Sequence, residues 1–146
     1  MLNHEELIEM WKKDCVINPL RLSEELYKQP LLHSKYLEML QAMKIKIRSL
    51  HRSFDKMREV KIRYYSGHLT KEELDHYKWD QYQYTVPTKT KMESLLDADT
   101  DLQTIREKIE YIKIMAETCE SIMREISARG FNLKSVIEWE KFQGGG

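Results

Sequence analysis

Apolar residues recur at alternating steps of three and four along two long stretches of the chain. The first stretch runs from Leu31 to Ser66 and contains neither glycine nor proline. This spacing is the heptad pattern of helices that pack along one another, so residues 31–66 are predicted to form one long helix. Its apolar positions are Tyr36, Leu40, Met43, Ile47, Leu50, Phe54 and Met57.

A second heptad pattern covers residues 92–128. It is separated from the first by a connector, Gly67 to Lys91, in which Pro87 interrupts any long helix. Two long helices joined in this way predict an all-α fold built on an antiparallel helical hairpin. The apolar positions of the second pattern are Leu95, Ala98, Leu102, Ile105, Ile109, Ile112, Ala116, Cys119, Met123 and Ile126.

Shorter helices are predicted before the first long helix and inside the connector. Residues 1–30 are expected to hold short helices, the first of which starts at a capping box formed by Asn3 and Glu6. Thr70 and Glu73 have the same spacing and predict the start of a short helix in the connector.

Gly130 is expected to end the second long helix in the left-handed conformation. Residues 129–143 would then form a separate C-terminal helix, and residues 144–146 a flexible tail. Residues 1–143 are therefore predicted to form a single helical domain. Because two helices alone make a thin core, we expect the heptads to drive assembly into a homo-oligomer. A monomeric bundle, in which the short helices cover the hairpin, is the alternative.

Charged residues are segregated along the chain, although 24 Lys and Arg balance 24 Asp and Glu overall. Residues 31–66 hold nine basic and three acidic residues, whereas residues 93–128 hold four basic and nine acidic residues. The basic residues are free for an anionic partner, or they pair with the acidic helix as flanking heptad positions do. Four of them form a row at steps of four, Lys44, Arg48, Arg52 and Lys56, and Arg58, Lys61 and Arg63 follow.

Two adjacent tyrosines stand among the last of these cations, at the end of the first long helix. Cations that bind phosphates and rings that stack on bases are together typical of proteins that hold single-stranded nucleic acid. Further rings follow in the connector, where each ring alone more often packs than stacks. The predicted DNA-binding residues are Lys44, Arg48, Arg52, Lys56, Arg58, Lys61, Arg63, Tyr64 and Tyr65.

The motifs of enzymes, metal sites and cofactor sites do not occur in the sequence. There is no glycine-rich nucleotide motif and no nucleophile elbow, and the five histidines have no metal-ligand spacing. Asp97, Asp99 and Asp101 lack the glycine and distal glutamate of a calcium loop, so we expect a solvated helix start there. The sequence therefore predicts a protein that is not an enzyme and binds no metal or cofactor.

Cysteine usage and hydropathy bear on the cellular compartment. Cys15 and Cys119 are far apart in sequence and are expected to be free thiols in a reducing compartment. No run of eighteen apolar residues predicts a membrane span, and the acidic N-terminus does not resemble a signal peptide. These features favour a cytosolic protein without membrane contact.

Three stretches of the chain have a distinctive sequence: KIRYYSG from Lys61, ARGFNLKSVIEWEKF from Ala128, and the acidic first helix followed by KKDCVI from Lys12. Together they resemble the UvsY recombination mediator family of T-even-type phages. The two basic positions of the family's DNA-contact motif fall on Glu59 and Lys61, so only the second is basic here. Arg58 and Arg63 are the neighbouring cations that we expect to replace the first.

The resemblance implies a function and partners that the residue pattern alone does not supply. Members of this family bind single-stranded DNA without sequence preference and are not enzymes. They contact the phage single-strand-binding protein and the phage RecA-like recombinase, and they help load the recombinase onto covered DNA. The resemblance thus implies a recombination mediator that acts in the cytoplasm of the infected bacterial host.

The resemblance also implies how the chain assembles. Family members form hexamers or heptamers and use their C-terminal region to do so, which corresponds here to residues 128–142. A coiled-coil scaffold, whose basic helix pairs with its own acidic helix and binds no DNA, is the alternative function. The predicted interface residues are Phe131, Leu133, Val136, Ile137 and Trp139.

Overall fold

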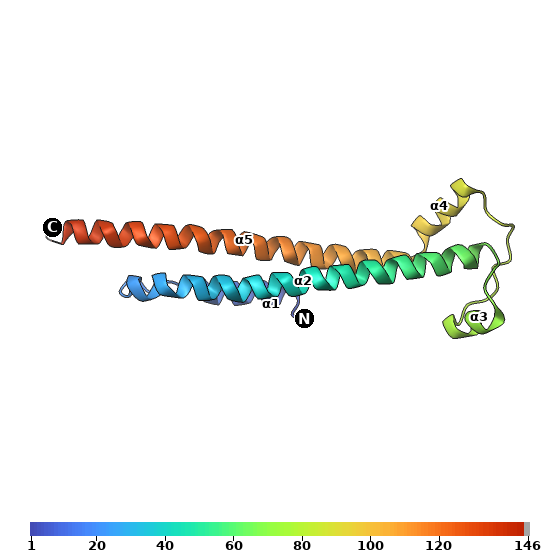
Figure 1. Ribbon diagram of the computed structural model, residues 1–146, viewed down its shortest axis with the longest axis horizontal. Coiled ribbons are helices and arrows are strands. Elements are labelled where there is room, and N and C mark those ends of the chain that lie inside the picture. The colour runs from blue at the N-terminus through green and yellow to red at the C-terminus, as the bar shows by residue number, and fades with distance from the viewer. Residues whose placement is uncertain (145–146) are drawn as a thin grey trace. The chain divides into compact units, whose positions relative to one another are not determined.

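The computed structural model describes residues 1–144 and is built from helices alone within that range (Figure 1). This finding confirms the predicted all-α fold. None of the helices in the described chain has an apolar stretch long enough to cross a membrane. The helices are α1 (His4–Asp14), α2 (Leu22–Tyr65), α3 (Lys71–Tyr77), α4 (Lys89–Ala98) and α5 (Thr100–Gln143).

The chain divides into two compact units. The first unit contains Met1–Ile45 and the chain from Ile112 onward, and the second contains Lys46–Tyr111. Helices α2 and α5 each contribute one segment to both units. Within each unit the two segments pack antiparallel, as the predicted hairpin requires.

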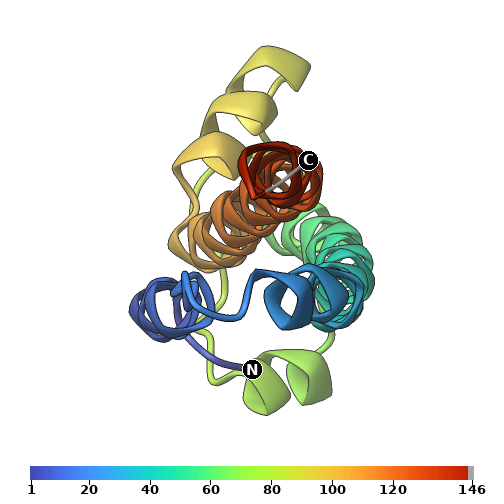
Figure 2. The same ribbon diagram turned by 90° about the vertical axis from the view of Figure 1, so that its left-hand side faces the viewer.

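The first unit is a three-helix packing of α1, the start of α2 and the end of α5, seen end-on in Figure 2. Trp11 of α1 meets Tyr36 of α2 edge to face, with ring centroids 5.7 Å apart. The Tyr36 hydroxyl donates to Asp14, at 2.9 Å, and the Cys119 thiol of α5 donates to the backbone oxygen of Tyr36. The side chains of Leu7, Tyr36 and Cys119 are fully buried, so α1 completes a core that two helices alone would leave thin.

Local signals in the sequence set several helix ends as predicted. Asn3 accepts a hydrogen bond from the backbone N–H of Glu6, whose carboxylate accepts in return from the N–H of Asn3. The same reciprocal box forms between Thr70 and Glu73 at the start of α3. Gly67 follows the end of α2 with φ +75°, a conformation that glycine adopts without a steric penalty.

The first long helix begins earlier than predicted. It starts at Leu22 rather than Leu31 and passes through Pro30 without ending. A proline inside a helix removes one backbone hydrogen bond and costs about 3 kcal/mol. Glu25 and Gln29 are both buried on the turns before it, so packing in the first unit holds the helix together across the proline.

The second long helix is interrupted where one continuous helix was predicted. Helix α4 ends at Ala98, Asp99 has extended backbone angles, and α5 begins at Thr100. The Asp99 carboxylate accepts a hydrogen bond from the N–H of Leu102, at 3.0 Å, which makes Asp99 the N-cap of α5. Asp99 is buried, so the expectation of a solvated helix start is wrong at this residue.

Helix α5 does not end at Gly130, so the predicted left-handed cap and the separate helix over residues 129–143 are wrong. The chain stays helical to Gln143, and the N–H of Gly144 still bonds to Glu140, at 2.9 Å. Arg129 lies over the Trp11 ring and Leu133 is buried. These contacts outweigh the cost of about 1 kcal/mol for a glycine inside a helix. Of the predicted flexible tail, Gly145 and Gly146 lie outside the described residues.

Candidate nucleic-acid interface

The second unit contains most of the predicted DNA-binding residues. It is made of the end of α2, the connector with α3, the helix α4 and the start of α5. Lys44 alone of the predicted set belongs to the first unit. The eight others therefore share one compact unit, and their surroundings divide them into a paired group and an exposed group.

Lys61 lies at the centre of a cluster that also contains the buried Asp99, the half-buried Trp79 and Tyr65, and the exposed Asp101 (the Lys61 cluster). Its Nζ atom lies 2.6 Å from the Asp101 carboxylate and 3.1 Å from that of Asp99. The same atom lies 3.9 Å from the centroid of the Trp79 ring. Only 5 % of Lys61 is exposed, so its charge is neutralised inside the unit.

Asp99 ties this cluster to the tyrosine pair. The Asp99 oxygen that lies near Lys61, Oδ2, also accepts a hydrogen bond of 2.6 Å from the Tyr65 hydroxyl. Burial opposes ionisation of Asp99, but the Tyr65 hydroxyl, the N–H of Leu102 and Lys61 together keep its pKa below the usual value. Burial and the bond to Asp99 raise the pKa of Tyr65. The hydroxyl therefore stays protonated and the carboxylate stays charged at neutral pH.

Tyr64 is also engaged inside the unit. Its hydroxyl donates to the backbone oxygen of Asp80, at 2.8 Å. Its ring contacts those of Tyr65 and Trp79, each with centroids 5.2 Å apart, and that of Tyr82, at 5.8 Å. Tyr64 and Tyr65 are thus half-buried members of an aromatic packing, rather than freely exposed rings.

Two further predicted cations are paired with acidic residues. The Arg63 guanidinium donates to Glu73 of α3, at 2.7 Å, and lies 3.3 Å from Glu59. The hydrogen bond from Arg63 is the main reason why the pKa of Glu73 lies below its usual value. Arg58 lies 3.4 Å from Glu93 of α4. Arg58 and Arg63 therefore tie the end of α2 to the neighbouring helices.

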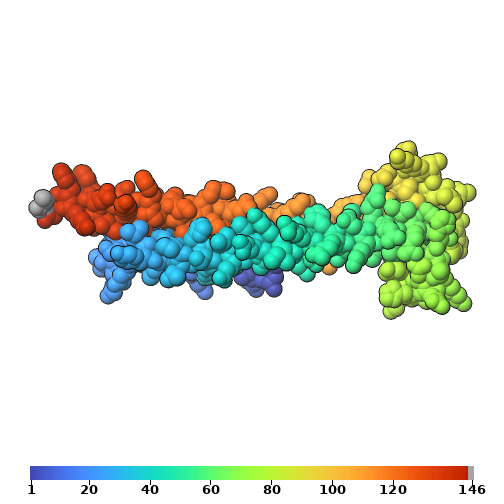
Figure 3. Space-filling view, in the orientation of Figure 1, coloured from blue at the N-terminus to red at the C-terminus, as the bar shows by residue number. Residues whose placement is uncertain are grey.

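The remaining predicted cations are exposed. Arg48, Arg52 and Lys56 lie on the segment of α2 in the second unit, and none has an ion pair within the described residues. Steps of four place them on one side of the helix, about 6 Å apart along its axis. In Figure 3 this segment of α2, coloured cyan to green, has an uncovered surface facing the viewer. Lys44 is equally exposed and without an ion pair in the described part of the first unit.

Sequence reasoning missed the partners of Lys61. The heptad and i, i+4 rules compare residues on one helix, whereas Asp99 and Asp101 come from the junction of α4 and α5. One signal was available: an aspartate three residues before Leu102, the pattern of a helix N-cap. A cap at Asp99 would have predicted the break and placed its carboxylate at a helix start.

The predicted interface residues in the C-terminal part of α5 differ in exposure. Leu133 is buried in the first unit and Ile137 is half-buried. Phe131, Val136 and Trp139 are 74 %, 44 % and 58 % exposed, and the neighbouring Phe142 is 74 % exposed. The Trp139 and Phe142 rings stack with centroids 6.0 Å apart. The apolar side chains available to a partner are therefore mainly aromatic.

The remaining groups of interest are the potential metal ligands and the two thiols. No group of three His, Cys, Asp or Glu side chains there could hold a metal ion. Cys15 and Cys119 are free thiols, half-buried and buried respectively. Burial raises the pKa of Cys119 to about 11, so the Cys119 thiol is protonated and unreactive at neutral pH.

Three comparisons with known proteins agree with this architecture. Residues 10–146 match the family described as "Recombination, repair and ssDNA binding protein UvsY". The "Recombination protein uvsY" of Enterobacteria phage T4 is 26 % identical over 141 residues, and the match covers 97 % of each chain.

Solved structures of the phage T4 recombination mediator protein UvsY are similar in fold. One crystal form superposes with a TM-score of 0.82 at 25 % identity, covering 99 % of this chain and 100 % of the other. A second gives a TM-score of 0.83 at 23 % identity, covering 97 % and 99 %. The chain therefore belongs to the UvsY family of recombination, repair and single-stranded-DNA-binding proteins.

Proposed function

We propose that the second unit binds single-stranded DNA without sequence preference through the exposed cations Arg48, Arg52 and Lys56. The observation that carries this proposal is that these side chains share one side of α2 and have no carboxylate partner in the described chain. Such a row attracts any phosphate backbone and reads no base. Lys44, four residues before Arg48, belongs to the first unit, and its contact with DNA stays a prediction.

The paired cations take a different role in this proposal. Lys61, Arg58 and Arg63 hold the end of α2 against α3, α4 and α5, so they fix the surface beside which DNA lies. Direct contact of Lys61, Tyr64 or Tyr65 with DNA stays a prediction. The burial of Lys61 and the hydrogen bonds of both tyrosines favour a supporting role for all three.

We further propose that the chain is a mediator that helps a RecA-like recombinase replace the single-strand-binding protein on DNA. Membership in the UvsY family supports this role. A hexamer or heptamer, formed through Phe131, Val136 and Trp139, would repeat the basic surface and raise the effective concentration of DNA contacts. The exposure of these three side chains supports such an interface.

Neutralising the exposed row tests the DNA-binding proposal. The triple variant Arg48→Gln, Arg52→Gln and Lys56→Gln should bind labelled oligo-dT at least tenfold more weakly, as measured by fluorescence anisotropy. Each phosphate contact contributes about 0.7 to the slope of log affinity against log salt. Loss of three contacts should therefore reduce this slope by about 2 per subunit.

A matched control removes three exposed cations from the first unit instead. Lys13, Lys134 and Lys141 are exposed and have no ion pair in the described chain, so their change to Gln alters net charge equally. This control should keep the wild-type salt slope per bound subunit, a quantity that does not depend on assembly through residues 128–142. Equal binding by both triple variants and the wild type would show that the row is not the DNA-binding surface.

The ion pairs of Lys61, Arg63 and Arg58 favour a second candidate function, a scaffold whose basic residues are used internally. This candidate predicts no binding of oligo-dT at moderate salt by the wild-type chain. The same titration therefore separates the two functions before any variant is made.

A further inference from the structure

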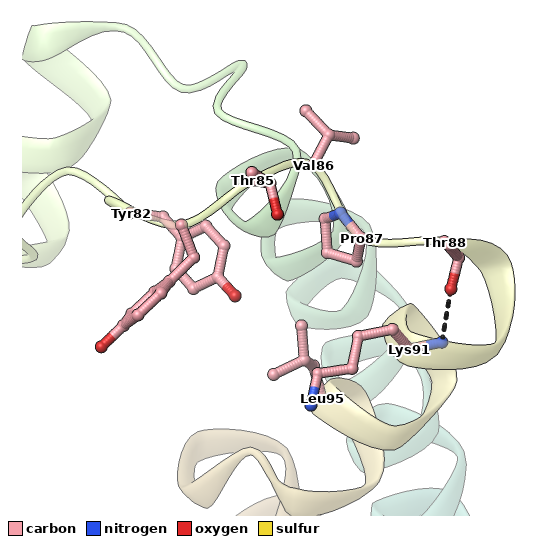
Figure 4. Close-up of a pocket in the computed structure, with 8 residues that line it drawn as sticks. Tyr82, Thr85, Val86, Pro87, Thr88, Lys91 and Leu95 are labelled. Carbon is pink, nitrogen blue, oxygen red and sulfur yellow. Dashed lines mark hydrogen bonds between the residues drawn. The ribbon is translucent and has the colours of Figure 1, made fainter.

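A hollow of about 480 Å³ opens between the connector and the start of α4. Its lining includes Tyr82, Tyr84, Pro87, Lys91 and Leu95. In Figure 4, Tyr82 lies across the hollow from Lys91 and Leu95, and Pro87 lies on the chain segment between them. The volume falls within the range of about 300–1,000 Å³ that is usual for small-molecule sites.

Tyr84 provides an open aromatic surface at this hollow. It is 78 % exposed, and its ring contacts that of Tyr82, with centroids 5.3 Å apart. Tyr82 in turn packs against Tyr65, at 5.1 Å, and Tyr64, at 5.8 Å. The exposed Tyr84 ring is therefore the last of a series of contacting rings that begins with Tyr65 in the Lys61 cluster. Its neighbour Tyr82 is held in place by Tyr64 and Tyr65.

The hollow also carries positive charge that its surroundings do not neutralise. Lys91 has no ion pair within the described residues, and no aspartate or glutamate is among the residues that line the hollow. The first turn of α4 contains no acidic residue either, and Lys89 adds a second exposed cation there. An anionic group is the complement that this arrangement favours.

We propose that the hollow binds one nucleotide of single-stranded DNA, with its base stacked on Tyr84 and an adjacent phosphate near Lys91. The inference rests on the proposed DNA binding and adds a base-contacting site to a unit whose row of exposed cations meets only the backbone. Ring and cation side by side recognise a nucleotide better than an apolar peptide, which would leave Lys91 without a partner. Because every base has a flat face, stacking on Tyr84 would add no sequence preference to DNA binding.

Two ligands of equal length separate stacking from charge: oligo-dT and an abasic oligonucleotide with the same number of phosphates. Tyr84→Ala should weaken binding of oligo-dT about fivefold or more, which is the lower end for loss of one stacked base. The same variant should bind the abasic strand as the wild type does. Tyr84→Phe keeps the ring and should retain wild-type affinity for both ligands.

Changing Lys91 should weaken binding of both ligands, whereas changing Tyr84 should weaken binding of oligo-dT alone. Lys91→Gln should weaken both ligands by a similar factor and lower the salt slope by about 0.7, because the phosphate contact does not need a base. Tyr27→Ala is the matched control for Tyr84, since Tyr27 is also 78 % exposed but belongs to the first unit. It should change neither affinity.

The outcomes distinguish this inference from the function on which it rests. If the wild type binds neither ligand, the proposed DNA binding fails and the hollow has no role in it. If the wild type binds oligo-dT and Tyr84→Ala binds it equally well, the hollow takes no base. An equal loss of both ligands by Tyr84→Ala would also overturn base stacking.

Discussion

Lys61 is a residue whose charge is neutralised by its surroundings instead of being available to a ligand. The cluster of cations beside two tyrosines and the resemblance to UvsY predicted a residue that faces DNA, but its Nζ atom lies close to two carboxylates and over an indole ring. The sequence could show that cations and rings gather at the end of α2. It could not show the partners, because Asp99 and Asp101 are brought to Lys61 by the folding of the connector and α4.

Removing one member of the buried pair should be far more costly than removing both. Lys61→Met leaves the Asp99 carboxylate buried and without its cation, which should lower the free energy of unfolding by about 3–5 kcal/mol. Adding Asp99→Asn should recover much of that loss, since asparagine remains a good N-cap for α5 and carries no charge. Urea unfolding of the two single variants and the double variant measures this coupling.

A double variant no more stable than Lys61→Met alone would contradict the account of Lys61 as a counter-ion. Lys13→Met provides the control, because Lys13 is exposed and has no ion pair in the described residues. Its free energy of unfolding should stay within about 0.5 kcal/mol of the wild type.

Among the elements, the heptad patterns predicted both long helices, and local motifs predicted the two capping boxes and the end of α2 at Gly67. The errors have a common physical cause. Gly130 was taken to end a helix, and the first long helix was predicted to begin only after Pro30, whereas packing in the first unit carries the helix through both positions. At Asp99 the reverse occurred, and an apolar pattern that runs on through a cap concealed the break.

Gly130 should therefore be replaceable with a gain in stability. A Cβ atom at Gly130 would meet nothing within 4 Å, and its φ is helical. Gly130→Ala should raise the free energy of unfolding by about 0.5–1 kcal/mol, because alanine loses less backbone entropy on folding. Gly67→Ala should instead lower it by about 1 kcal/mol, since φ there is +75°. A loss of stability in Gly130→Ala, measured by urea unfolding, would argue against a continuous α5.

For the whole molecule, the proposed DNA surface and the proposed assembly surface belong to different units. Arg48, Arg52 and Lys56 lie in the second unit, whereas the exposed aromatics of α5 lie in the first. Variants at the DNA surface should therefore leave the number of subunits unchanged, and variants at the assembly surface should leave the DNA contacts of each subunit unchanged. The sequence supported the assembly region only through the resemblance to UvsY, because exposure along a helix depends on which neighbours cover it.

Removing the exposed aromatics should reduce the size of the assembly without unfolding the chain. We expect Phe131→Ser, Trp139→Ser and Phe142→Ser together to give smaller species in sedimentation velocity, because these rings would otherwise bury apolar surface between subunits. Affinity for oligo-dT should fall as well, through lost multivalency, while the salt slope per bound subunit stays unchanged.

Tyr27→Ser is the control for this assembly test, since Tyr27 is as exposed as these rings but lies on α2. It should sediment as the wild type does. If the aromatic triple variant kept the wild-type stoichiometry, the interface would have to lie elsewhere on the chain.

The buried pair of Lys61 and Asp99 also settles how α2 and α5 are aligned within the second unit. Heptad packing by itself tolerates a slip of seven residues, because similar apolar side chains then face one another again. In one direction such a slip would bring Phe54 to the place of Lys61, and in the other it would pass the end of α2 at Tyr65, so Asp99 would face no ammonium group in either case. A lone buried carboxylate makes both slipped registers costly, so the pairing of Lys61 with Asp99 favours one alignment among several that the apolar residues alone would allow.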